Sequence, residues 1–321
     1  MRSFISGFRS LTPASRATLA LIAGCAAIVV AAETVVRVGF NVVSTIQRRM
    51  ATEYHAAIGA RASASGHVAL FVGNSLLNEG LQFDVIQTHL APEWDVRRFV
   101  VEQTFYYDWY YGLRRLFADG ARPDVVVIVL TPLQWIRDDM RGDYTAYHLM
   151  TVGDAASAAR RLNMARTAAT GFMLASVSEF WSARAELRNF LMGRVLPGFG
   201  QLMNATSVVD LRVLDDDDVE RVVTKRFEQC REIADAHGAR LVALVPPVLE
   251  SRDGAEGLLR AGRRAGVTVF APVRSGTYPT DFYRDAGYHL NTVGANRFTT
   301  EIIDSLQATL ERILSRSAAA M

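Results

Sequence analysis

The chain has 321 residues, of which 50% are hydrophobic and 21% charged, and this composition excludes a disordered or collagen-like protein. Its 35 Lys and Arg against 33 Asp and Glu leave a net charge of +2, which gives no nucleic-acid-binding signature. The two cysteines, Cys25 and Cys230, lie far apart in the sequence and build neither a zinc finger nor a disulfide framework.

The first predicted element is a transmembrane signal anchor over residues 17–36. Ala17–Ala32 carries no charge, and with Glu33 at the interface the apolar run reaches Val36. About 20 residues at roughly 1.5 Å each are enough to cross the hydrocarbon core of a bilayer. Residues 1–16 form a short basic tail that contains no acidic residue.

The order of tail, span and large domain predicts the compartment. A short basic tail favours a cytoplasmic N-terminus, although arginines flank the span on both sides in nearly even number. We expect a single-pass protein of the cytoplasmic (inner) membrane with its domain on the periplasmic, extracytoplasmic side. A cleaved signal peptide or a buried helix is the alternative. A lipoprotein site at Cys25 is a further alternative that also leaves the domain outside.

After residues 37–65, which predict a stalk or first helix, apolar strand patterns alternate with helical patterns. Strands are expected at 67–72, 95–101, 124–130, 240–245 and 267–273. Helices are expected at 103–117, 215–237, 250–265 and 292–315. Alternation of this kind predicts an α/β fold, a flavodoxin-like, doubly wound, parallel five-stranded sheet that places ligands beyond the carboxyl ends of its strands.

One block interrupts the alternation. Residues 138–214 contain no clear strand, and helical patterns cover 155–168 and 175–191. We interpret this block as an inserted helical cap. The α/β domain is then expected to consist of residues 66–137 and 215–321.

Ser75 is the first candidate for chemistry. It follows the first predicted strand in the segment Gly73-Asn74-Ser75-Leu76. A serine there projects from the top of the sheet, and the amides of a following helix N-terminus point at the same place. The alternative is a serine that only caps this helix.

Asp285 and His289 are the second candidates, between the last strand and the last helix. A carboxylate and an imidazole in one loop can form a pair in which the acid orients the base. The alternative for a lone loop histidine is a hydrogen bond to the backbone. Ser75 and this loop are expected at the same rim of the sheet, and Ser, Asp, His is a recurrent order of catalytic triads.

These two segments resemble blocks of the SGNH (GDSL-like) hydrolase superfamily. Gly73-Asn74-Ser75-Leu76 is similar to its first block, and Asp285 to Gly294, with His289-Leu290-Asn291, is similar to its last. The resemblance implies that Ser75 is the nucleophile, His289 the general base and Asp285 the residue that orients His289.

The chain departs from the family pattern in two ways. Three residues separate Asp285 from His289 where the family has two, so Asp281 remains an alternative third member. The glycine and asparagine that the family uses in its oxyanion hole are missing from 102–104 and 131–134. The candidates for oxyanion or substrate contacts are therefore Asn74, Thr104, Thr131, Gln134 and Asn291.

The membrane anchor and the degenerate blocks resemble export-side SGNH-like proteins that O-acylate cell-envelope polysaccharides. The resemblance implies a serine O-acyltransferase or esterase that acts on acyl groups, acetyl being the expected one, beside a membrane-bound O-acyltransferase. The alternatives are a non-catalytic SGNH-fold scaffold or glycan-binding subunit and a cytoplasmic flavodoxin-like binding module.

No pattern indicates a cofactor. The chain has no Walker A, G-x-G-x-x-G or H-E-x-x-H sequence, and its histidines lack metal-ligand spacing, so neither a cofactor nor a metal is expected. The four aspartates from Asp215 predict a helix start. The aromatic run 105–111 favours helix packing, with a stacking platform for sugars as the alternative.

Overall fold

The sheet has the predicted parallel, five-stranded arrangement. A computed structural model describes residues 12–61, 66–198 and 212–318. Its strands follow the order β2-β1-β3-β4-β5, and every neighbouring pair is parallel. This order confirms the flavodoxin-like prediction. The strand bounds are β1 His67–Gly73, β2 Trp94–Val100, β3 Val125–Val129, β4 Arg240–Leu244 and β5 Thr268–Phe270.

β3 shows why these residues form a central strand. Its five residues, Val-Val-Val-Ile-Val, are all buried and β-branched, as expected of a strand covered on both faces. Val125, Val127 and Val129 join the core on one face of the sheet, whereas Val126 and Ile128 join the core on the other. The sheet is therefore doubly wound.

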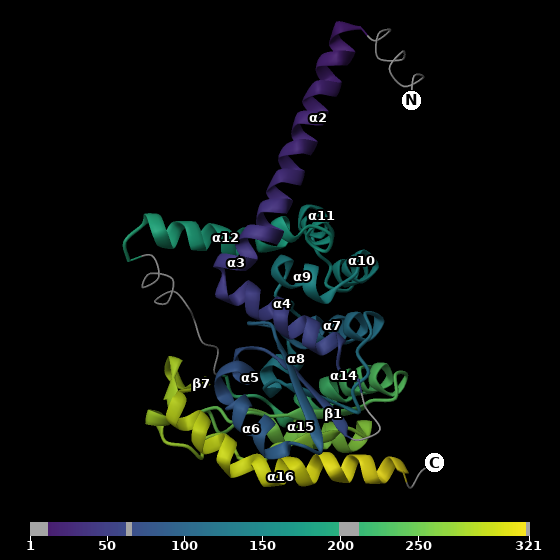
Figure 1. The fold of residues 1–321 in the computed structure, drawn as a ribbon. Helices are drawn as coiled ribbons and strands as arrows, with labels where there is room; N and C mark the ends of the chain where they lie inside the picture. The colour runs from purple at the N-terminus through teal and green to yellow at the C-terminus, as the bar shows by residue number, and fades with distance from the viewer. Residues whose placement is uncertain (1–11, 62–65, 199–211, 319–321) are drawn as a thin grey trace.

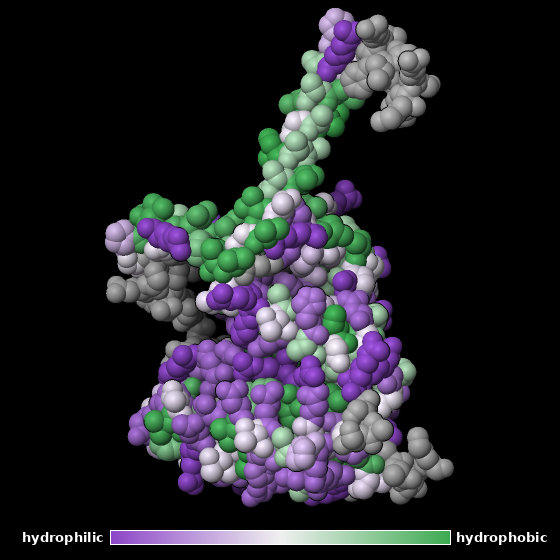
Figure 2. Space-filling model, viewed as in Figure 1, coloured by the Kyte–Doolittle hydropathy of each residue, from purple (hydrophilic) through white to green (hydrophobic). Residues whose placement is uncertain are grey.

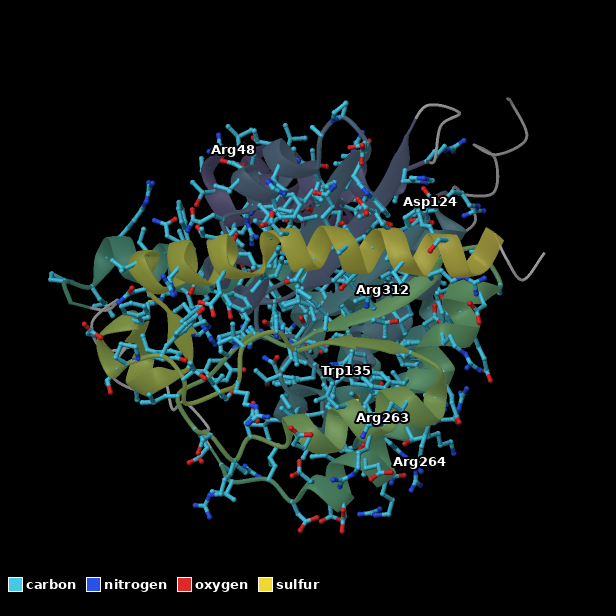
Figure 3. The ribbon with its side chains drawn as sticks, turned by 90° about the horizontal axis from the view of Figure 1, so that it is seen from below. Arg48, Asp124, Trp135, Arg263, Arg264 and Arg312 are labelled. Carbon is cyan, nitrogen blue, oxygen red and sulfur yellow. The ribbon has the colours of Figure 1, made fainter. Side chains whose placement is uncertain are left out.

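Helices cover both faces. On one face lie α5 (Ser75–Gly80), α6 (Phe83–Leu90) and α16 (Thr292–Ala318), which Figure 3 shows running across the molecule with Arg312 on it. The other core contains side chains of α4 (Thr45–Ile58), α7 (Tyr106–Ala118), α14 (Asp216–Asp235) and α15 (Ala255–Ala265). The short helices α8 (Pro132–Ile136), η2 (Thr280–Phe282) and η3 (Asp285–Gly287) and the antiparallel pair β6 (Tyr283–Arg284) and β7 (His289–Leu290) complete the α/β part.

The insertion between β3 and β4 contains more helices than the two predicted. Its helices are α9 (Asp143–Leu149), α10 (Val152–Arg161), α11 (Arg166–Ala175) and α12 (Glu179–Val195). The predicted helix 155–168 is broken after Arg161, where Asn163 has a φ of 48°. The predicted helix 175–191 instead begins at Glu179, because the side chain of Ser178 caps it by accepting from Trp181 N. Residues 199–211 of the predicted cap lie outside the described residues.

The N-terminal segment forms one long helix. α2 (Pro13–Thr34) continues through η1 (Val35–Phe40), and these 28 residues are long and apolar enough to cross a membrane. Figure 1 shows α2 rising away from the body, with the helices of the insertion at its base. Residues 1–11 of the predicted tail lie outside the described residues.

The predicted stalk is built into the body. α3 (Asn41–Val43) leads into α4, whose Glu53 accepts from the Val100 amide of β2 at 2.9 Å. Glu53 also accepts from Arg98 Nε at 2.8 Å, so α4 is held against the edge of the sheet. Residues 62–65 lie outside the described residues.

Candidate active site

The turn after β1 places Ser75 at the carboxyl rim of the sheet. β1 ends at Gly73, where an added Cβ would lie 2.8 Å from the carbonyl oxygen of Val129 on β3. Asn74 then caps α5, and its Oδ1 accepts from Leu76 N at 3.0 Å. Ser75 is the first residue of α5, and its half-buried side chain leaves the helix at its N-terminus.

A small hairpin carries His289. β6 and β7 pair Arg284 with His289, and the turn between them contains Ala286 and Gly287 at φ of 56° and 99°. A Cβ on Gly287 would lie 2.4 Å from Leu249 Cβ, so only glycine fits there. The additional residue between Asp285 and His289 therefore forms part of this turn.

The structure brings Ser75 and His289 together. Ser75 Oγ lies 2.8 Å from His289 Nε2, which is hydrogen-bond distance between a nucleophile and its base. Asp285 begins η3, four positions before His289. Asp281 lies in η2 with an exposed side chain, and its carbonyl oxygen accepts from Asn291 Nδ2 at 2.6 Å. Which of the two aspartates orients His289 stays a prediction.

Asn74 and Thr104 join the turns after β1 and β2. Asn74 Nδ2 donates to the Thr104 carbonyl oxygen at 2.9 Å. Thr104 Oγ1 donates to the Val101 carbonyl oxygen at 2.8 Å and accepts from Trp109 Nε1 at 2.9 Å. Both side chains are fully buried. These bonds give both residues a structural role beside Ser75.

Asn291 and Gly294, the remaining polar and glycine positions of the last block, shape the start of α16. Asn291 Oδ1 accepts from the amides of Val293 and Gly294, each at 3.0 Å. An added Cβ on Gly294 would lie 2.4 Å from the Phe282 carbonyl oxygen. This part of the motif therefore packs α16 closely against the segment that bears His289.

Thr131 and Gln134 form a capping box at the start of α8. Gln134 Oε1 accepts from Thr131 N at 3.0 Å. Gln134 Nε2 donates to Tyr288 Oη at 2.6 Å, and the Tyr288 ring meets the His289 ring edge-on, with centroids 4.9 Å apart. Gln134 thus contacts the hairpin through Tyr288. The role of Tyr288 was not predicted from the sequence, where its position next to His289 was the only signal.

Two further features of the site escaped the sequence analysis. Gln103, just after β2, has a φ of 59°, a conformation that normally favours glycine. Glu79 on α5 forms an ion pair with Arg284 on β6. This pair links the helix that begins with Ser75 to the hairpin that ends with His289.

Charge around the rim is largely paired. Burial raises the pKa of Glu102, just after β2, and the nearby Arg49 guanidinium opposes this rise.

The aromatic run packs inward, since Tyr106, Trp109 and Tyr111 are buried. Among residues 12–61, 66–198 and 212–318, no group of three or more His, Cys, Asp or Glu side chains is placed to hold a metal ion.

No protein-family model matches the chain, and no curated protein matches it. Among solved structures, LAE5, described as an alpha/beta hydrolase enzyme from the metagenome of Lake Arreo, Spain, is 11% identical with a TM-score of 0.38; the alignment covers 75% of this chain and 95% of LAE5. TesA is 12% identical with a TM-score of 0.36, over 74% of this chain and 97% of TesA.

Proposed function

We propose that this chain is a membrane-anchored serine enzyme that transfers acyl groups through Ser75. The observation that carries the proposal is the 2.8 Å contact between Ser75 Oγ and His289 Nε2 at the carboxyl rim of the sheet. A serine hydroxyl is a weak nucleophile alone, and a base in hydrogen-bond contact activates it. In this proposal Asp285 orients the imidazole and stabilises its protonated form.

The reaction proceeds in two halves. Ser75 Oγ attacks the carbonyl carbon of an acyl ester while His289 Nε2 takes the hydroxyl proton, and His289 then returns this proton to the leaving alcohol. A sugar hydroxyl or water next attacks the acyl-serine, and His289 takes the proton of that attacking group. The acyl group leaves Ser75 as a new ester or as a free acid, and the proton returns to the serine.

Backbone amides are the oxyanion donors that we propose. The Leu76 amide is held by Asn74 Oδ1 and the Leu77 amide by the Asn74 carbonyl oxygen. The Ser75 amide, first in α5, makes no hydrogen bond within the described residues and faces no intrahelical acceptor. Each such donor contributes about 3 kcal/mol to transition-state stabilisation.

The resemblance to export-side O-acylating proteins supports the finer proposal. The acceptor is then an extracytoplasmic polysaccharide and the acyl group acetyl. The acyl donor comes from a membrane-bound O-acyltransferase. α2 spans the inner membrane and leaves the catalytic domain on the periplasmic side.

Labelling with a fluorophosphonate tests whether Ser75 is the nucleophile. This probe forms a covalent phosphonate ester with an activated serine and releases fluoride. We expect the full chain in detergent to be labelled and both Ser75→Ala and His289→Ala to lose the label. Ser305→Ala on α16 and His89→Ala on α6 are matched controls that should label like the unchanged chain. Labelling that survives Ser75→Ala would refute the assignment of Ser75.

A non-catalytic scaffold or glycan-binding subunit is the second candidate. The observation that favours it is the structural use of Asn74, Thr104 and Asn291, which leaves few side-chain donors for an oxyanion. The close contact of Ser75 with His289 speaks against it. A folded chain that takes no label at any probe concentration would favour the scaffold.

A further inference from the structure

The apolar surface of α2 does not stop where the body begins. Figure 2 shows hydrophobic surface continuing from α2 along α12 at the top of the body. Exposed large apolar side chains gather there in a group that we call the apolar collar: Val38, Val42, Leu174, Val177, Leu191 and Val195. Val195 is 72% exposed. On the α/β body such side chains, for example Val85 and Val293, are isolated, which is usual for a soluble surface.

The collar lies at the depth where the span ends. Counting about 20 residues at roughly 1.5 Å each from Ala17 takes the hydrocarbon core to about Val36. Glu33, within the last turn before this point, accepts from Ser178 Oγ at 2.8 Å, Glu179 N at 2.9 Å and Phe180 N at 3.2 Å. Its carboxylate thus fixes the N-terminus of α12 to the end of the span.

From this anchoring point α12 runs across the direction of α2, as Figure 1 shows. Phe180 and Phe190 of α12 pack against Val36 and Phe40 of η1, and the rings of Phe40 and Phe190 lie 5.7 Å apart. The packing holds the helix beside the span. From Leu191 onward the end of α12 is exposed on all sides.

Arginines and aromatic rings flank the apolar residues of α12. Arg184 lies over the Trp181 ring at 4.6 Å and Arg194 over the Phe190 ring at 4.4 Å, and Arg188 is exposed. Long basic side chains and aromatic rings next to apolar residues are typical of helices at a lipid interface, where the cations reach anionic headgroups.

We propose that the apolar collar and α12 lie in the bilayer interface, as a second membrane contact that does not span. The bilayer is the occupant because the collar is continuous with the span and lies at the depth of the headgroups. The proposal rests on the membrane-spanning role of α2, but it does not depend on the chemistry of Ser75. The helices of the insertion then form a platform on the membrane.

Spin labels on the full chain in vesicles of phosphatidylethanolamine and phosphatidylglycerol test this placement. Native Cys25, exposed on α2, reports the span, whereas burial raises the pKa of Cys230 to about 12 and keeps its thiol unreactive. Val195→Cys and Leu191→Cys, each with Cys25→Ser, report the collar. Val293→Cys and Val85→Cys in the same background are matched controls on the body.

The readout is the ratio of collision rates with oxygen, which concentrates in lipid, and with a water-soluble nickel chelate. We expect the ratio at positions 195 and 191 to exceed that at 293 and 85 several-fold. A ratio at both collar positions equal to the controls, with Cys25 still in lipid, would overturn the proposal.

Two other outcomes also overturn it, for different reasons. If the label at Cys25 collided with the water-soluble chelate, α2 would not lie in the hydrocarbon core. The collar would then not lie at the bilayer interface. Collar labels that collide with neither oxygen nor the nickel chelate, and that show dipolar broadening between labels, would identify a second copy of the chain as the occupant. Ser75→Ala should leave all these ratios unchanged, so a failure here is distinguishable from a failure of the proposed chemistry.

Discussion

Two glycines set the geometry of the Ser75–His289 pair. Gly73 lets β1 approach β3 just before the serine, and Gly287 lets the hairpin pass over Leu249 just before the histidine. Either position with a Cβ would push one partner away from the other. Because a hydrogen bond weakens steeply with distance and angle, small displacements here are expected to disrupt the contact.

Two parallel substitutions test which aspartate is the third member of the proposed triad. We expect Asp285→Asn to slow fluorophosphonate labelling about 10⁴-fold, because the imidazole would then lose its orienting carboxylate. Asp281→Asn should change the labelling rate little, since the Asp281 side chain is exposed and its carbonyl already serves Asn291. The reverse ranking would assign the role to Asp281. Thermal unfolding of both variants checks that they fold.

His148 on α9 gives the insertion an acid-dependent stability. Burial and the Arg115 charge lower its pKa from 6.5 to about 4. The unfolded chain therefore binds more protons than the folded one between pH 4 and 6.5, and the free energy of unfolding falls as pH falls through that window.

Thermal unfolding in detergent at about pH 7 and about pH 5 measures the effect of His148. We expect His148→Gln to lose less stability than the unchanged chain on this acidification. His55→Gln, at an exposed position, is the control and should follow the unchanged chain. An identical loss of thermal stability in all three proteins would contradict the assignment of this pH dependence to His148.

The contact between Ser75 and His289 was predictable, because each residue follows a strand of the main sheet in the sequence and parallel strands bring their carboxyl ends to one rim. Their partners depend on tertiary contacts without a local pattern. Gln134 reaches Tyr288 across 154 positions, and the left-handed Gln103 stands where glycine would be expected. The structural use of Asn291 in capping α16 likewise follows only from its position in space.

At the scale of elements, the insertion shows where periodicity misleads. Its alanine- and arginine-rich sequence favours helix almost throughout, so the breaks at Asn163 and Ser178 depend on a left-handed residue and a cap. The strands were easier to predict, because their β-branched runs are bounded by proline and glycine. The two-residue strands β6 and β7 are too short to give a pattern.

Glu33 should control how firmly α12 is held. Glu33→Ala removes the acceptor of Ser178 Oγ and of the Glu179 and Phe180 amides. A lost helix cap costs about 0.5–2 kcal/mol, so the amides of residues 179–182 should exchange hydrogen faster. Hydrogen exchange of the full chain in detergent measures this, with Glu256→Ala on α15 as the control. Unchanged exchange at the start of α12 would show that the contact contributes nothing.

At the scale of the whole molecule, the fold class followed from the order of strands and helices alone. Right-handed crossovers leave few sheet orders for such an alternation, and the observed β2-β1-β3-β4-β5 is one of them. The position of the insertion at the base of α2 could not be predicted, because it depends on Glu33 and η1 meeting α12 far along the chain.

The joint between α2 and the body has a kinetic consequence. η1 continues α2 without a linker and packs through Val36 and Phe40, so α2, the proposed membrane span, is joined rigidly to the domain. A flexible tether would let the rim of the sheet sample a wide volume, and its effective concentration toward a membrane-borne reactant would depend on tether length. With a rigidly joined span, the effective concentration is high for reactants held at one distance from the membrane and in one orientation. It is low for all other reactants. In the proposed function, the choice of substrate would then depend partly on where a reactant is held.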